Sequence, residues 1–333
     1  MLITITGNSV GNVAWVDQDY GDAYISQHVG LVRLTDPTLA PFVCRYLAPG
    51  APGNPQIAAS QSGQSKPGLN LGNLAEFLVN FPPPVEAKAI ATTLSDVDAL
   101  LGALDRLIAK KRDLKQAAMQ QLLTGQTRLP GFSGKWEERR VCDMGEVLAG
   151  KALDVHGAGR HRPYLRTKNV LDGRIDIDDV LEMPMTDAEF ERFRVKHGDV
   201  LLNEGQSVEL VGRCSLYRDE LPVPCAMQNQ LLRFRAKPTT ASSFAEQVFR
   251  CCQHDGTFAS IATQTTSVAH LGSVRFANLR LRWPLELKEQ EAVGGVLADM
   301  DAELLALEQR RDKTHLLKQG MMQELLTGRT RLV

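Results

Sequence analysis

The chain has 333 residues and a formal net charge of −1, with 43% hydrophobic and 23% charged residues. This length suffices for two domains with separate cores, and the composition is that of a soluble globular protein. No apolar run approaches the roughly 20 residues of a bilayer span, and Met1 is not followed by a basic segment and a small-residue cleavage site, so we expect the protein in the cytoplasm. Because proteins that coat DNA non-specifically are basic, any DNA contact must come from local patches.

The cysteines predict neither disulfides nor a metal site. They follow no framework spacing, so reduced thiols are expected: Cys44, Cys142, Cys214, Cys225, Cys251 and Cys252. The cluster Cys251-Cys252-Gln253-His254 lacks the second ligand pair that a structural zinc site needs. We therefore expect buried cysteines on a helix and no metal.

Residues 1–81 are expected to form a first body of mixed α/β structure with short strands and polar loops. Short polar side chains on loops are suited to hydrogen bonding with DNA bases. The candidates for DNA contact in this body are Asn8, Ser9, Gln61, Gln64, Ser65 and Lys66. Each of them, taken singly, is also what an ordinary surface loop contains.

Residues 82–129 predict one long helix. The prolines at 82–84 suit its first turn, and Thr124-Gly125 suits its end. Apolar residues recur in alternating steps of four and three, the a/d rhythm of a coiled-coil seam: Ile90, Leu94, Val97, Leu101, Leu104 and Ile108. Such a stripe on a rod of roughly 60 Å requires a partner.

Residues 130–283 predict a second mixed α/β body. Strand-like runs occur at 199–203, 207–217 and 230–235, and helices are expected at 186–194 and 240–254. A basic, hydrogen-bonding stretch and two polar loops are the candidates for DNA contact: Arg160, Arg162, Tyr164, Arg166, Lys168, Asn169, Gln206, Ser207, Gln264, Thr265, Thr266 and Ser267. Arginine and lysine hold phosphates or read guanine, asparagine and glutamine pair with adenine, and tyrosine stacks or anchors the backbone.

Residues 284–333 repeat the first long helix. Residues 86–129 align without gaps on 289–332, and 22 of the 44 pairs are identical, which indicates a duplication. The second copy keeps the rhythm at Val293, Leu297, Met300, Leu304 and Leu307. The matching stripe on the other copy is the expected partner, and two buried helices of a bundle are the alternative. The repeat continues upstream more weakly, where Gly7 aligns with Gly205 and Leu71-Gly72 aligns with Leu271-Gly272.

No catalytic constellation is convincing. Asn80-Phe81-Pro82-Pro83 resembles the Asn-Pro-Pro-Tyr loop of amino-methyltransferases, but its prolines are displaced by one residue. The glycines at 7 and 11 lack the Gly-Lys-Ser/Thr end of a phosphate-binding loop. The carboxylates at 172, 176, 178 and 179 are dense enough for a nuclease metal site, but their spacing fits a solvated turn better. The sequence argues against an enzyme that acts alone.

The whole pattern resembles the specificity subunits of type I restriction–modification enzymes. The most specific features are the Leu-Leu-Thr-Gly-x-Thr-Arg tails at 122–128 and 325–331. Residues 163–170 with Asp172-Gly173, then residues 198–203 and Gly212, resemble the core of the family's target-recognition domain. The carboxylate pairs Glu86/Asp98 and Glu289/Asp301 resemble its helix-start pattern.

The resemblance implies two α/β (α+β) target-recognition domains joined by two long helices packed as an antiparallel coiled coil. Each domain reads one half of a bipartite site in double-stranded DNA, and the helices set the gap. The partners implied are two methyltransferase (modification) subunits and the restriction/translocase subunits. S-adenosylmethionine, ATP and magnesium belong to those partners, so this chain is expected to hold no cofactor and to be non-catalytic by itself.

One departure from the family concerns the first body. The second body runs about 65 residues, Trp136 to Val200, before the point that matches Leu2, so residues 1–81 are expected to be a partial, N-terminally truncated domain. A late start or a decayed gene would explain this, and poor solubility is expected because a half-domain exposes strand edges. A recognition-defective scaffold that only docks modification subunits is therefore the alternative function.

Overall fold

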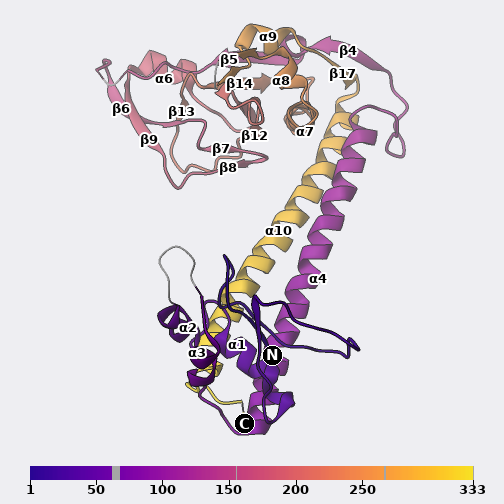
Figure 1. Ribbon diagram of the computed structural model, residues 1–333. Helices are drawn as coiled ribbons and strands as arrows, with labels where there is room; N and C mark the ends of the chain where they lie inside the picture. Colours follow the sequence, from indigo (N-terminus) through magenta and orange to yellow (C-terminus); the bar gives the residue numbers. More distant parts are fainter. Residues whose placement is uncertain (62–67, 155, 266–267, 333) are drawn as a thin grey trace. The chain divides into compact units, whose positions relative to one another are not determined.

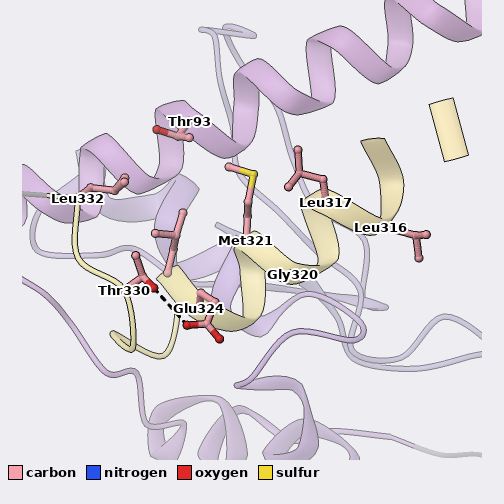
Figure 2. Close-up of a pocket in the computed structure, with 9 residues that line it drawn as sticks. Thr93, Leu316, Leu317, Gly320, Met321, Glu324, Thr330 and Leu332 are labelled. Carbon is pink, nitrogen blue, oxygen red and sulfur yellow. Dashed lines mark hydrogen bonds between the residues drawn. The ribbon is translucent and has the colours of Figure 1, made fainter. Parts of the chain in front are cut away.

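The computed structural model describes residues 1–61, 68–154, 156–265 and 268–332, which fall into two compact units (Figure 1). Unit 1 comprises Met1–Ala109 and Ala306–Val333, and unit 2 comprises Lys110–Leu305. This division differs from the four parts expected from the sequence (1–81, 82–129, 130–283 and 284–333), because each unit contains one body together with parts of both long helices. No helix in the described ranges is both long and apolar enough to cross a membrane.

Unit 1 contains a small antiparallel sheet with strand order β2-β1-β3, packed beside short helices. Its elements are β1 (Leu2–Thr4), β2 (Val13–Ala14), β3 (Val29–Leu31), η1 (Pro37–Leu39), α1 (Ala40–Leu47), α2 (Asn54–Ser60) and α3 (Leu71–Glu76), with the first part of α4 (Pro84–Leu122) and the last part of α10 (Leu287–Leu325). Asn70 caps α3 by accepting from the backbone N–H of Asn73 at 2.8 Å.

Unit 2 contains a larger body built around a sheet of order β12-β10-β14-β5, with α7 packed against β12 and β10 (Figure 1). Its strands are β4 (Trp136–Arg140), β5 (Gly145–Ala149), β6 (Arg160–Leu165), β7 (Val170–Leu171), β8 (Arg174–Ile175), β9 (Leu181–Met185), β10 (Asp199–Asn203), β11 (Gly205–Gln206), β12 (Cys214–Leu216), β13 (Ala226–Met227), β14 (Leu231–Ala236), β15 (Thr263–Gln264), β16 (Ala269–His270) and β17 (Arg280–Pro284). Its helices are α5 (Val141–Met144), α6 (Asp187–Phe193), α7 (Ser242–His254), α8 (Thr257–Ile261) and α9 (Ser273–Asn278), with the remaining parts of α4 and α10.

The two bodies share a hydrogen-bonded frame. In unit 1 the Gly11 N–H donates to the carbonyl of Thr4, and the Leu69 N–H donates to the carbonyl of Ile5. In unit 2 the Gly212 N–H donates to Asn203, and the Leu271 N–H donates to Glu204. Thr4 in unit 1 therefore occupies the same structural position as Asn203 in unit 2, and Leu69 occupies the same position as Leu271. The alignments of Gly7 with Gly205 and of Leu71-Gly72 with Leu271-Gly272 were therefore wrong by one or two residues.

The ends of the long helices are buried in the bodies. Ile90 and Leu94 lie in a core with Phe42 and Leu47 of α1 and with Leu325 of α10. In unit 2, Val293 and Leu297 lie in a core that contains Phe244, Phe249, Met119 and Leu122. The aromatic rings of Phe234 and Phe249 meet edge to face at 5.1 Å. These side chains bury their apolar area against a body as well as against a helix.

Within each unit the two helices run antiparallel. In unit 1, Lys318 pairs with Asp98 at 2.6 Å, and Arg311 pairs with Asp105 at 3.9 Å. The residue number thus rises along α4 while that of its partner on α10 falls. In unit 2, Lys111 pairs with Glu303 at 2.7 Å, and Lys115 pairs with Asp301.

The expected seam is buried unevenly. Leu101 and Leu104 of α4 are buried, as are Ile90 and Leu94, whereas Val97 is half-buried. On α10 Val293 and Leu297 are buried, whereas Met300, Leu304 and Leu307 are half-buried. The a/d rhythm therefore identifies the inward face, but not how completely each position is covered.

The predictions for the second body were largely confirmed. The runs 199–203 and 230–235 are β10 and β14, and the helices predicted at 186–194 and 240–254 are α6 and α7. The strand expected at 207–217 was wrong over its first half: the N–H groups of Leu210 and Val211 donate to Ser207, and only Cys214–Leu216 form a strand. Gly212 closes this turn with φ +77°.

Candidate nucleic-acid interface

A three-stranded sheet in unit 2, with order β11-β16-β15, brings together two of the expected polar loops. Gln206 pairs with Ala269, and Ala269 pairs on its other side with Gln264. Ser207 follows Gln206 directly, and both are half-buried, whereas Gln264 and Thr265 are exposed. The sheet therefore presents amide and hydroxyl groups from loops more than 50 residues apart in the sequence.

The turn after β15 is held by Thr265, whose backbone N–H and Oγ1 both donate to the carbonyl of Val268, at 2.8 and 2.9 Å. At the base of the sheet, His270 Nδ1 lies 3.1 Å from Glu204 Oε2. These bonds fix the backbone beneath Gln264 while its amide stays exposed. Thr266 and Ser267, also expected to contact DNA, lie outside the described residues.

The basic stretch at 160–168 is partly neutralised within the fold. Arg166 and Lys168 both bind the carboxylate of Asp179, at 2.7 and 2.5 Å, and together they hold the pKa of that carboxyl below its usual range. Arg162 binds Asp187 at 2.7 Å and lies over the ring of Phe190. Within the described ranges Arg160 has no ion-pair partner, and it is exposed.

Two expected contact residues are buried, and their direct contact with DNA does not fit this structure. Tyr164 is only 3% exposed and packs with Met183, Met185 and Phe190. Asn169 is 2% exposed, and its amide nitrogen donates to the carbonyls of Asp176 and Asp179 at 2.8 and 3.0 Å. The Asn169 amide therefore ties loops of the fold together, and the Tyr164 ring belongs to a small core.

In unit 1 the structure describes three of the six candidate residues. Asn8 and Ser9 are exposed in the turn after β1, and Gln61 ends α2. Thr6 Oγ1 lies 2.5 Å from His28 Nδ1 beside this turn. Gln64, Ser65 and Lys66 lie outside the described residues.

Sequence reasoning missed a charged cluster that ties unit 2 to its helices. Arg250 of α7 is 5% exposed and binds Asp172 at 2.7 Å and Asp301 at 2.5 Å. Asp301 also binds Lys115, and Asp172 binds His254 at 3.2 Å. The partners lower the pKa of Asp172 and Asp301, against the effect of burial. Asp172 lies exposed in the turn between β7 and β8, where it is held by ion pairs to Arg250 and His254.

Unit 1 repeats this cluster in a simpler form. Arg45 of α1 binds Asp98 at 2.8 Å, and Asp98 also binds Lys318. The carboxylates at the helix starts behave in parallel: Arg331 binds Glu86 at 2.5 Å in unit 1, and Arg128 binds Glu289 in unit 2. The repeat contained a signal for these ion pairs. Their charged residues in the first tail recur 203 residues later in the second tail, as Glu86 does at Glu289 and Asp98 does at Asp301.

The arrangement contains no obvious nucleophile or metal site. Burial raises the pKa of the thiols of Cys44 and Cys225 to about 11, so both stay protonated near neutral pH. Within the described ranges, no group of three or more histidine, cysteine or acidic side chains is placed to hold a metal ion. The exposed candidate side chains can therefore form hydrogen bonds and ion pairs with a ligand.

Comparison with known proteins identifies relatives of one kind. No family model matches the sequence. The chain is 22% identical over 194 residues to the putative type I restriction enzyme MjaX specificity subunit of Methanocaldococcus jannaschii, covering 58% of this chain and 45% of that protein. It is 24% identical over 198 residues to the type I restriction enzyme EcoKI specificity subunit of Escherichia coli strain K12, covering 55% and 43%. The match thus spans about half the length of these curated relatives.

The fold has a solved counterpart. The crystal structure of the type I restriction–modification system S subunit from M. genitalium superposes with a TM-score of 0.67 at 15% identity, covering 97% of this chain and 82% of that one. The α+β fold expected from the sequence is therefore confirmed. The proteins that this chain resembles, in sequence and in fold, are specificity subunits of type I restriction–modification systems.

Proposed function

We propose that this chain is a DNA-specificity subunit of a type I restriction–modification complex. It binds a bipartite site in duplex DNA, one half-site to each body, and the paired helices hold the modification and restriction subunits. The observation that carries the proposal is the duplicated frame: two bodies with three corresponding hydrogen-bonded strands and a similar ion-paired attachment to long helices, but with different surface loops.

The chemistry of the loops agrees with such a role. Gln264 and Thr265 in unit 2, and Asn8 and Ser9 in unit 1, offer exposed side chains that donate and accept hydrogen bonds, which is what base edges require. Arg160 supplies an unneutralised charge for a phosphate. By this proposal S-adenosylmethionine, ATP and magnesium act in the partner subunits, and the complex works in the cytoplasm.

The test is DNA binding by the full chain together with its modification subunits, across a range of salt concentrations. Arg160→Ala is expected to weaken binding on all sequences alike and to reduce the salt slope by about one, because one phosphate contact is lost. Arg174→Ala, at an exposed arginine elsewhere in unit 2, is the matched control. An unchanged slope in the Arg160 variant contradicts this role for the residue.

A second candidate is an assembly scaffold that docks modification subunits without reading DNA. The neutralisation of Arg166 and Lys168 by Asp179, and the burial of Tyr164 and Asn169, favour it. The same titration separates the candidates, since a scaffold leaves the complex with the sequence preference and salt slope of non-specific binding. Binding that selects a split site supports the specificity role.

A further inference from the structure

Unit 1 has a bare face where the matching face of unit 2 is covered. The turn that precedes β3 in unit 1 matches the turn that precedes β14 in unit 2. The Val29 N–H donates to the carbonyl of Ser26 at 3.1 Å, and the Leu231 N–H donates to the carbonyl of Gln228 at 2.9 Å. Tyr24 and Ile25 therefore correspond to Ala226 and Met227. Tyr24 is 93% exposed and Ile25 is 45% exposed, whereas Ala226 and Met227 are completely buried.

The cover in unit 2 comes from residues 145–195. Ala226 and Met227 form β13, which pairs in parallel with β6, and the Lys151 N–H donates to the carbonyl of Met227 at 3.0 Å. Leu165, Val170 and Val195 pack on Met227 in one core. Within the described residues, unit 1 has no strand that pairs with Tyr24 or Ile25.

The edge of the sheet is open on the same side. β14 lies between β10 and β5, whereas β3 has β1 as its one neighbour among the described residues. Val32 donates to Met1, and His28 accepts from Ile5, so by the antiparallel alternation Leu31 directs its N–H and C=O away from β1. In unit 2 the corresponding residue, Arg233, pairs with Leu148 of β5.

The side chains repeat this difference. Leu31 is 37% exposed, whereas Arg233 is 2% exposed and donates to the carbonyl of Arg194 and to Glu146. Two residues further on, Arg33 corresponds to Arg235. Arg235 binds Asp199 through two hydrogen bonds of 2.7 Å, whereas Arg33 is exposed and has no carboxylate partner in the described ranges.

We propose that the face formed by Tyr24, Ile25, Leu31 and Arg33 is a docking surface for a polypeptide module with the fold of residues 145–199. The module adds one strand antiparallel to β3 and a second strand parallel to Tyr24–Ile25, and it supplies a carboxylate to Arg33. Strand addition satisfies the open backbone groups, and burial of Tyr24 and Ile25 supplies the apolar contact. The inference rests on the duplication and not on DNA binding.

The experiment uses the full chain extended at Met1 by a second copy of residues 136–199, since Val200 corresponds to Met1. We expect exchange of the Leu31 amide to slow about tenfold or more and hydroxyl-radical oxidation of Tyr24 to fall several-fold. The Gly30 amide faces β1 with or without the module and serves as the internal reference. An extension of the same composition in scrambled order is the matched control.

Two variants of the extended chain sharpen the result. Ile25→Asp is expected to abolish the protection, because it places a charge in the docked apolar face. Leu31→Arg is expected to increase the protection, because it recreates the contact of Arg233 with Glu146. The proposal is overturned if the native and scrambled extensions give equal Leu31 exchange and equal Tyr24 oxidation in both the original and the Leu31→Arg chains.

Discussion

Arg250 shows how a residue without a motif organises a whole unit. It joins Asp172, which lies in a loop of the body, to Asp301, which lies on α10. The sequence placed Asp172 in a solvated turn but could not predict its ion pair, because nothing local links residues 78 positions apart. It also placed the buried Tyr164 and Asn169 on the DNA-contacting surface. Polar and aromatic side chains serve both in cores and in interfaces, so residue type alone could not decide between them.

Replacement of Arg250 is expected to destabilise unit 2. Arg250→Met removes the buried cation that the exposed Asp172 and the half-buried Asp301 share, and we expect a loss of about 2 kcal/mol or more in the free energy of unfolding. Urea unfolding of the full chain measures it. Arg174→Met changes an exposed arginine of the same body and should cost less than about 0.5 kcal/mol. Equal effects of the two variants would show that the cluster contributes nothing specific.

The same cluster predicts a pH dependence. The pKa of Asp172 is lowered in the folded chain, so its contribution to stability is fully present above its unfolded pKa of about 3.8 and is lost as the pH falls towards the folded value. The difference in urea midpoint between the original chain and Asp172→Asn should be present at pH 5 and shrink below about pH 4. A difference that persists undiminished at pH 3 would refute this assignment.

At the scale of the elements, periodicity and caps carried most of the prediction. The a/d rhythm and the Thr-Gly ends located α4 and α10, and the Thr186 cap located α6. The short strands β11, β15 and β16 were missed, because two-residue strands leave no periodicity to detect. The rhythm also could not reveal that Ile90 and Leu94 pack into a body, because that packing depends on α1, which lies more than 40 residues earlier in the chain.

The uneven burial of α4 makes a matched pair of substitutions informative. Leu94→Ala removes a completely buried side chain from the core of unit 1, and we expect a loss of about 2–5 kcal/mol in unfolding free energy. Leu107→Ala, on the same helix at 39% exposure, should cost less than about 1 kcal/mol. Amide exchange in α1 reports the loss locally. If both variants exchange alike, Leu94 does not belong to the core of unit 1.

At the scale of the whole molecule, duplication separates what the two units share from what distinguishes them. The shared parts are the hydrogen bonds of the sheet and the ion pairs to the helices, which hold each body together and attach it to the helices. The distinguishing parts are loops, such as those that carry Gln264 and Thr265 in unit 2 and Asn8 and Ser9 in unit 1, whose side chains take no part in the shared hydrogen bonds and ion pairs. Recognition by such loops is expected to be independent in the two units, because the units have separate cores and substitutions that share no partner usually act additively.

Selection of bound sequences from a randomised DNA pool tests this independence, with the modification subunits present. Gln264→Ala with Thr265→Ala is expected to change the preferred bases of one half-site and leave the other unchanged, with about 1–3 kcal/mol of discrimination lost for each base contact removed. Asn8→Ala with Ser9→Ala should change the opposite half-site only. The salt slope should stay constant in both variants, because no phosphate contact is removed. A change at both half-sites from either pair would mean that the bodies do not read DNA separately, and no change from either would move recognition away from these loops.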